Sequence, residues 1–167
     1  MRAADYETIT GRRLDLSQLD AGEREFLGRV GEKYRVQPEW TDFGSWWVTE
    51  FESRGLATDS VVYRICQDLE ARLGIAQGKV APPDYRDYLV DLIEERFGSR
   101  SKFCKEIGID PGHLSRVLAH RAEFSFPSLQ KIMVALQAAL VIQSREKLYK
   151  HLSPKDASRA LAAAVSV

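Results

Sequence analysis

The chain has 167 residues, a length typical of one domain or two small ones. Its hydrophobic fraction of 44% is enough to build a core and too high for a disordered chain. The 24 Lys and Arg side chains balance 24 Asp and Glu side chains, and this zero net charge excludes a histone-like protein that coats nucleic acid indiscriminately, although it is compatible with a locally basic face.

The N-terminal segment predicts a short hairpin or an extended arm. Residues 6–16 alternate between polar and apolar side chains and carry Gly11 in the middle. Asp20, with Glu23 three residues later, forms a capping box that opens the first helix. Apolar residues then recur at helical spacing, and we expect this helix to end at about Arg35.

Two further helices are expected in the first half of the chain. Asp42 is the expected cap of a helix that runs to about Ser53. Asp59 is the expected cap of a third helix, and Gly74 marks its end. Both segments carry apolar side chains at intervals of three and four residues, which is typical of helices that pack on one face.

All three tryptophans lie close together, as Trp40, Trp46 and Trp47. Two of them are adjacent, so on a helix they project about 100° apart, and one can face the core while the other faces a neighbour. Three interpretations stay open: a plug in the core between the N-terminal part and the rest of the chain, an interface with a second copy or a partner protein, and a small-molecule pocket.

Residues 75–84 contain one glycine and two prolines and predict a boundary. A helix over 84–98 and further short helices are expected up to Leu140. Residues 141–143 are more strand-like, and Ser153 followed by proline opens a last helix. We expect three parts: an N-terminal helical accessory region over 1–78, a middle domain over 79–143 and a C-terminal tail helix over 144–167.

Two short helices joined by a tight turn are predicted in the middle domain. Residues 100–107 make two helical turns, and Gly108 stands where a helix ends with positive φ. Ile109 is apolar and should be buried beneath the turn. Asp110 is a good N-cap for a second helix over 111–118, which begins with proline. The inward positions are apolar: Phe103, Cys104, Ile107, Leu114, Val117 and Leu118.

The outward face of the second helix suits the major groove of DNA. Gly112, His113, Ser115, Arg116 and Ala119 are small or hydrogen-bonding residues. Small residues let the backbone approach the bases, Arg and His donate to guanine acceptors, and Ser adapts to several partners.

The stretch 99–140 resembles the helix-turn-helix of Cro/CI-type (XRE-like) bacterial DNA-binding domains. Gly108 matches the turn glycine of that family, and Cys104 stands at a small position that is usually alanine. The buried apolar positions of the family are matched by Phe103, Ile107, Ile109, Leu114 and Val117. Glutamine often opens both motif helices in the family, whereas this chain has Arg100 and Gly112, so the common reading of adenine by glutamine is not available.

The resemblance implies a fold that is mainly α, a helical bundle with a lambda-repressor-like helix-turn-helix domain, here with a short N-terminal β-hairpin or arm. Helix 111–118 would lie in the major groove, with base contacts from Gly112, His113, Ser115 and Arg116, of which Arg116 is the first choice for guanine. Phosphate contacts are expected from the residues that flank it: Ser99, Arg100, Ser101, Lys102, Lys105, His120 and Arg121.

Charge is distributed unevenly along the chain. Residues 99–150 hold nine basic and four acidic residues, a balance of +5, whereas residues 1–83 hold eleven basic and fourteen acidic residues, a balance of −3. A helix-turn-helix can also be a plain packing motif or a protein contact, and the basic cluster around the motif argues against that interpretation.

We therefore expect a sequence-specific double-stranded DNA-binding protein, a bacterial or phage transcriptional regulator such as a repressor. It should act as a homodimer, whose interface is expected in the last helices after Leu140 or in the tryptophan region. One alternative is an antitoxin-like autoregulator that binds a partner protein through its N-terminal part. Another is an interaction adaptor whose helix-turn-helix no longer reads DNA.

Enzymatic, metal-binding and membrane functions are not expected. Cys104 with His113 or His120 could form a nucleophile and base, but Cys104 occupies a buried position of the motif. The other cysteine, Cys66, is far away and without CxxC spacing, so we expect two reduced core thiols and no zinc site. The chain carries no glycine-rich phosphate loop, no HExxH motif, no signal core and no long apolar run. A cytoplasmic protein without a cofactor is expected.

Overall fold

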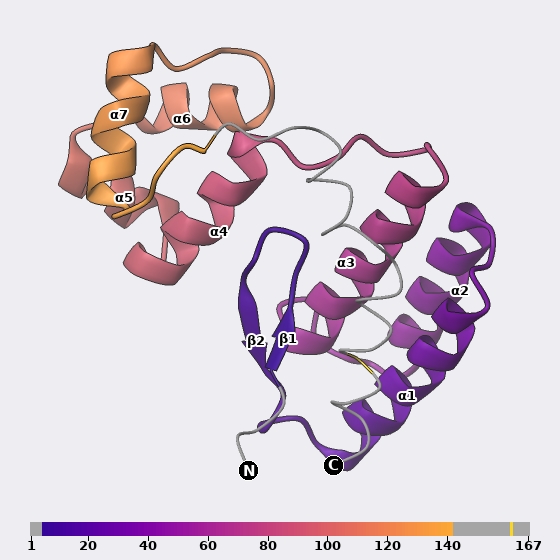
Figure 1. Ribbon diagram of the computed structural model, residues 1–167. Coiled ribbons are helices and arrows are strands. Elements are labelled where there is room, and N and C mark those ends of the chain that lie inside the picture. The colour runs from indigo at the N-terminus through magenta and orange to yellow at the C-terminus, as the bar shows by residue number, and fades with distance from the viewer. Residues whose placement is uncertain (1–4, 142–160, 162–167) are drawn as a thin grey trace. The chain divides into compact units, whose positions relative to one another are not determined.

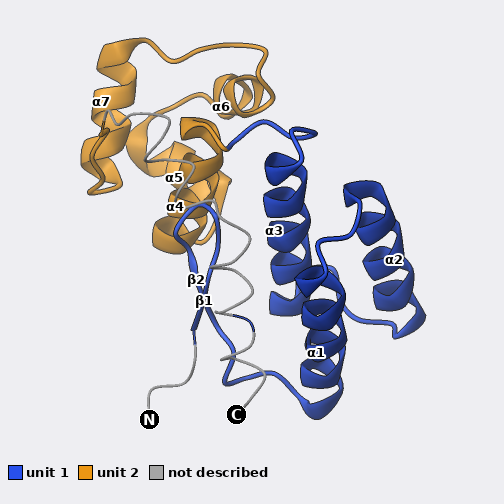
Figure 2. Cartoon of the chain, turned by 45° about the vertical axis from the view of Figure 1, so that its right-hand side comes forward, with its two compact units in different colours: residues 1–82, 144–167 blue, residues 83–143 orange. Residues whose placement is uncertain are grey.

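The computed structural model describes residues 5–141 and Leu161, and these residues are mainly helical with a small two-stranded antiparallel sheet (Figure 1). The prediction of a helical fold with a short N-terminal hairpin is confirmed. The chain divides into two compact units, Met1–Pro82 with Ser144–Val167 (unit 1) and Pro83–Gln143 (unit 2) (Figure 2). Among the described residues, no helix combines the length and the apolar character needed to cross a membrane.

Unit 1 begins with the hairpin. β1 (Asp5–Glu7) pairs antiparallel with β2 (Arg13–Asp15), and Tyr6 lies opposite Leu14. Both side chains are buried, because the alternating pattern turns one face of the hairpin toward the core. Gly11 adopts φ 85° in the connecting turn, a conformation that glycine reaches without steric penalty.

Helix α1 (Ala21–Arg35) begins and ends where the sequence predicts. The Asp20 side chain accepts from the Glu23 backbone N–H at 2.8 Å, and the Glu23 carboxylate accepts from the Asp20 N–H at 3.0 Å. The buried face of the helix consists of four apolar or aromatic residues at helical spacing: Phe26, Leu27, Val30 and Tyr34.

Helix α2 (Trp40–Ser53) begins earlier than predicted, and the expected cap, Asp42, lies inside its first turn. The cap is Glu39, whose carboxylate accepts from the Thr41 N–H at 2.6 Å. The Trp40 N–H donates to the side chain of Gln77 at 3.0 Å. A residue 37 positions away thus satisfies a free helix donor that the local sequence left open.

Helix α3 (Val61–Ala76) is capped by Ser60 rather than by Asp59, because the Ser60 hydroxyl accepts from the Tyr63 N–H at 3.2 Å. The helix also continues past Gly74, where an end was predicted. Gly74 is buried inside the helix, so its role is close packing and not chain reversal.

Replacing Gly74 by alanine is expected to destabilise unit 1. An added Cβ would lie 2.6 Å from Val80 Cγ2 and 3.0 Å from Trp40 Nε1. Alanine gains about 1 kcal/mol in helix propensity, but overpacking costs about 1–3 kcal/mol, so we expect a net loss of up to about 2 kcal/mol in the free energy of unfolding. Urea denaturation measures this loss, and a variant more stable than the wild type would show that this contact relaxes freely.

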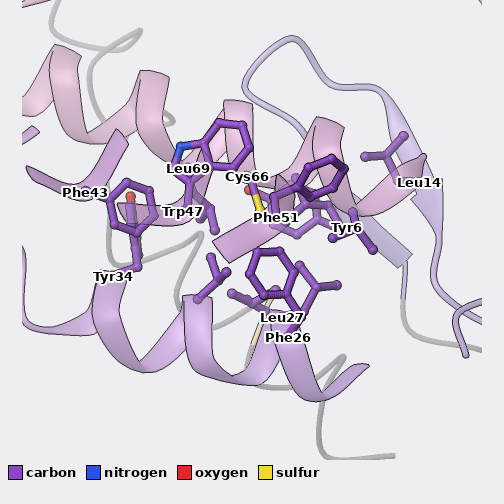
Figure 3. Packing of buried hydrophobic residues seen from close by; sticks show 14 of the residues in the cluster. Tyr6, Leu14, Phe26, Leu27, Tyr34, Phe43, Trp47, Phe51, Cys66 and Leu69 are labelled. Atoms are coloured by element: carbon purple, nitrogen blue, oxygen red, sulfur yellow. The ribbon is translucent and has the colours of Figure 1, made fainter. Parts of the chain in front are cut away.

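The core of unit 1 is rich in aromatic side chains (Figure 3). The rings of Tyr34 and Phe43 meet edge to face at 5.7 Å, and Trp47 and Phe51 do so at 6.2 Å. Cys66 is buried among them as a free thiol, as expected, and burial raises its pKa well above the ordinary value. The core also contains Leu161, whereas the rest of the predicted tail helix over 144–167 lies outside the described residues.

A buried ionic network attaches the hairpin to α3. Asp68 and Arg72 form an ion pair of 2.7 Å with both side chains about 5% exposed. Asp68 also accepts from the Tyr6 hydroxyl at 2.5 Å and from the Ile9 N–H at 2.6 Å. Arg72 donates in addition to the carbonyl of Glu7 at 3.1 Å. Asp68 and Arg72 of α3 therefore bind three groups of the hairpin: the Tyr6 hydroxyl, the Ile9 N–H and the Glu7 carbonyl.

Unit 2 contains four short helices: α4 (Tyr85–Phe97), α5 (Arg100–Ile107), α6 (Pro111–Leu118) and α7 (Phe126–Ala135). Gly98 ends the first of them at φ 73°, as expected. The last one begins after the Ser125 cap and ends earlier than the predicted helical region, which extended to Leu140. Val141 does not lie in a strand, and the other residues of the strand-like segment 141–143 lie outside the described residues.

Candidate nucleic-acid interface

The turn between α5 and α6 has the geometry that the sequence predicts. Ser99 caps α5 by accepting from the Lys102 N–H at 3.2 Å. Gly108 ends the helix in the left-handed region, at φ 71° and ψ 41°. The N–H groups of Gly108 and Ile109 both donate to the carbonyl of Cys104, at 2.9 and 3.0 Å. The chain can reverse here without a steric penalty because the residue is glycine.

Helix α6 starts immediately after this turn. The Asp110 carboxylate accepts from the His113 N–H at 2.6 Å, and Pro111 occupies the first helical position. Leu114 and Val117 are buried. The second motif helix therefore has the bounds that were expected from cap, proline and apolar spacing.

The two motif helices share one apolar core with α4. Phe103 and Cys104 of α5 and Leu114 of α6 are buried in the same cluster as Leu89 and Ile93 of α4. Burial raises the pKa of the Cys104 thiol, and the Asp110 carboxylate adds to this effect. A neutral thiol in this position is a packing group.

Two apolar residues near the turn are less enclosed than expected. Ile107 and Ile109 pack against the core of unit 2 but are only half-buried. The expectation of a buried Ile109 is therefore wrong in part. Its place at the turn between two helices leaves one side of the residue facing solvent.

The predicted base-contact residues lie on α6. Gly112, Ser115 and Arg116 are exposed, whereas His113 is half-buried and its ring meets Phe124 edge to face at 5.3 Å. An added Cβ on Gly112 would lie 3.4 Å from Arg116 Nη1. The Arg116 guanidinium therefore extends back over the bare backbone of Gly112, toward the first turn of the helix.

The Arg116 guanidinium also has a carboxylate within reach. Its Nη2 atom lies 4.0 Å from Oδ1 of Asp110, and both side chains are more than half exposed. A surface ion pair of this length contributes little to stability. It holds Arg116 near the N-terminal end of α6, and the guanidinium can leave Asp110 for another hydrogen-bond acceptor.

The predicted phosphate-contact residues all have exposed side chains. They lie at the start of α5, along α5 and directly after α6: Ser99, Arg100, Ser101, Lys102, Lys105, His120 and Arg121. His120 adopts a left-handed backbone at φ 56°. Its Nδ1 atom lies 3.9 Å from Oδ2 of Asp84, so this histidine is next to a carboxylate, unlike the other members of the set.

Charge is segregated within unit 2. Five of the eight acidic residues between positions 83 and 143 lie on α4 or at its cap: Asp84, Asp87, Asp91, Glu94 and Glu95. The basic residues of the motif lie on α5, on α6 and directly after it: Arg100, Lys102, Lys105, Arg116 and Arg121. The motif therefore carries five of the eight basic residues of a unit whose acidic residues are mostly on another helix.

A polar cluster missed in the sequence connects α4 to the segment between α6 and α7. Arg86 is buried and donates to the carboxylates of both Asp84 and Glu123. The Tyr85 hydroxyl donates to Glu123 at 2.7 Å, and this bond, with the nearby guanidinium, lowers the pKa of Glu123. Arg86 and Glu123 are 37 positions apart, so no local pattern could have paired them.

The three tryptophans all pack within unit 1. Trp47 is buried in the core, and its Nε1–H donates to the Glu70 carboxylate at 2.7 Å. Trp46 is half-buried, with the Lys33 ammonium 5.6 Å from the centre of its ring. Trp40 is half-buried as well. Trp47 therefore fills the core of unit 1 itself, and Trp40 and Trp46 keep part of their surfaces accessible.

Within residues 5–141 and Leu161, no group of three or more His, Cys, Asp or Glu side chains is arranged to hold a metal ion. Comparison of the chain with protein-family models, curated proteins and solved structures found no match. The assignment of the motif therefore depends on its residue pattern and on the geometry described above.

Proposed function

We propose that this chain binds double-stranded DNA in a sequence-specific manner through α6, as a transcriptional regulator of the bacterial or phage type. The observation that supports this most is the exposed face of α6. It is made of small and hydrogen-bonding residues, follows a glycine turn, and is surrounded by exposed cations. A helix of this composition fits the major groove, which is about 12 Å wide.

The proposed base contacts come from the exposed face of α6. Gly112 lets the backbone approach the base edges, and Arg116 reaches over it with two parallel donors that match the O6 and N7 acceptors of guanine. Ser115 adds an adaptable hydroxyl. His113 contributes less in this proposal, since its ring packs against Phe124.

The proposed phosphate contacts come from α5 and from the segment after α6. Lys102 and Lys105 are exposed on α5, and Arg121 follows the recognition helix. Cations at these places position the protein on the duplex without reading its sequence. The acidic residues of α4 would repel phosphates, so the charge pattern favours one orientation of this unit on DNA.

The proposed regulator acts as a homodimer. Four apolar side chains of unit 2 are strongly exposed on α7 and after it: Phe126 at 65%, Val134 at 78%, Leu140 at 48% and Val141 at 77%. Exposed apolar side chains are frequent where a unit contacts another chain. Two copies would present two recognition helices to half-sites one helical turn apart.

Placing a charge at Val134 is expected to disrupt this dimer. Val134→Glu should leave folding intact, because the side chain is exposed, but should convert dimers to monomers in sedimentation velocity runs and weaken binding to a palindromic site at least about tenfold. Val36→Glu, at an exposed position of unit 1, is the matched control. Unchanged dimerisation in Val134→Glu would place the interface elsewhere.

Selection of bound sequences from a random duplex library tests the proposed function directly. We expect recovery of a palindromic sequence with guanine at a fixed position in each half-site, and binding that weakens steeply with added salt. A pool without enrichment, together with equally weak binding to all duplexes, would contradict DNA recognition and favour an interaction adaptor.

A further inference from the structure

A pocket of about 390 Å³ lies between α2 and α3 in unit 1, outside the proposed DNA-binding motif. The rings of Trp40, Trp47 and Tyr63 form part of its wall, and the last two meet edge to face at 5.5 Å. The rest of the apolar lining consists of Val48, Ala71 and Val80. This volume is in the range of pockets that hold small molecules.

One carboxylate lines the pocket, that of Glu70. Its Oε2 atom accepts from the indole N–H of Trp47 at 2.7 Å, which fixes the carboxylate against the aromatic wall. The backbone of Gly44 leaves room for it, since an added Cβ there would lie 2.7 Å from Oε1. Two features of α2 therefore fix the position of the Glu70 carboxylate: the hydrogen bond from Trp47 and the space left by Gly44.

The Glu70 carboxylate has no cationic partner among residues 5–141 and Leu161, none of whose Lys or Arg side chains forms an ion pair with it. Burial raises the pKa of the Cys66 thiol, and the negative charge of Glu70 raises it further. A half-buried carboxylate beside three aromatic rings favours a cation, because the ring faces and the carboxylate both attract positive charge.

We propose that this pocket binds a small organic cation that carries N–H donors on an alkyl body, of the alkylguanidinium class. The cationic head would lie against the rings and donate to Glu70, while the alkyl part would contact Val48 and Val80. A planar guanidinium suits the site because it both stacks on indole rings and pairs with a carboxylate. The proposal is independent of the proposed DNA binding.

A titration with n-butylguanidinium, monitored by tryptophan fluorescence, tests this proposal. The concentrations of n-butylguanidinium stay well below those at which guanidinium salts denature proteins. Two of the three tryptophans line the pocket, so occupancy should change the emission. We expect saturable binding, and binding of neutral n-butylurea, which has nearly the same shape, at least about tenfold weaker. Equal binding of both compounds, or no saturation with either, would overturn the proposal, and this comparison requires no variant.

A pair of variants then assigns the site. Glu70→Gln removes the charge but keeps an acceptor for the Trp47 N–H, and it should weaken n-butylguanidinium binding about tenfold or more. Glu52→Gln removes a charge from an exposed position on α2 that does not line the pocket, and it should bind as the wild type does. Equal affinity of the two variants, each checked by thermal unfolding, would mean that the cation binds elsewhere. Binding of a basic peptide but not of the small cation would also contradict the proposal.

Discussion

Replacing Asp68 by alanine is expected to lower the free energy of unfolding by about 3–5 kcal/mol, a large part of the stability of a small domain. Asp68 is 7% exposed and Arg72 is 4% exposed, so removal of the carboxylate leaves a buried guanidinium without its counter-ion. Water cannot easily hydrate that charge in place. The rearrangement needed to do so is the source of the expected loss.

The same substitution also removes the acceptor that connects the hairpin to α3. The hydroxyl of Tyr6 and the N–H of Ile9 both lose their partner, and each buried unsatisfied donor adds a further cost. Urea denaturation measures the total. Hydrogen exchange should show that the amides of β1 and β2 lose protection first, because their attachment to the helices depends on this carboxylate.

Asp59→Ala serves as the control for this prediction. Asp59 is exposed just before α3 and is not the cap of that helix, so its removal should change the free energy of unfolding by less than about 0.5 kcal/mol. If Asp68→Ala were no more destabilising than Asp59→Ala, the hairpin would be held by the apolar contacts of Tyr6 and Leu14 instead of by the ionic network.

Replacing Arg116 by alanine is expected to weaken specific DNA binding by about 1–3 kcal/mol and to relax the preference at one base of each half-site. Arg116 is exposed and makes only a surface ion pair with Asp110, so the fold should not change. Competition binding measures both the loss of affinity and the loss of base preference. The competitors are the selected DNA site and duplexes that carry each other base at each position.

Lys102→Ala is the matched comparison for Arg116→Ala. Lys102 is exposed on α5, and loss of a phosphate contact from this place would weaken binding to all sequences alike and reduce the slope of affinity against salt by about one. An Arg116→Ala variant that behaved in this way would identify Arg116 as a phosphate contact. An Arg116→Ala variant with unchanged specific binding would mean that α6 is not the recognition helix.

The bounds of the motif helices could be predicted because the signals that set them are local. Asp110 caps a backbone N–H three residues away, and Gly108 reverses the chain through its own φ. The capping box of α1 is equally local. In each case the hydrogen-bond partners lie within five residues, so a short stretch of sequence contains all the groups that form these bonds.

The start of α2 and the continuation of α3 could not be predicted from such windows. Gln77 satisfies the first N–H of α2 from the far end of α3, and the cap is Glu39 instead of the expected Asp42. Gly74 resembles a helix end in the sequence but lies in the helix, because Trp40 and Val80 leave no room for a side chain. Contacts between distant segments therefore contribute to both features.

By itself, the sequence determined the helical class, the hairpin, and a glycine turn between two short helices with an exposed polar face. Only the tertiary structure decided which distant groups the buried charges contact, as Asp68 does with Tyr6 and Arg86 with Glu123, and only it placed Glu70 beside three aromatic rings. The physical reason is the separation along the sequence between the groups that contact each other. Helix caps and turns form between near neighbours, whereas Tyr6 lies 62 positions from Asp68 and Glu123 lies 37 positions from Arg86, so only folding brings these partners together.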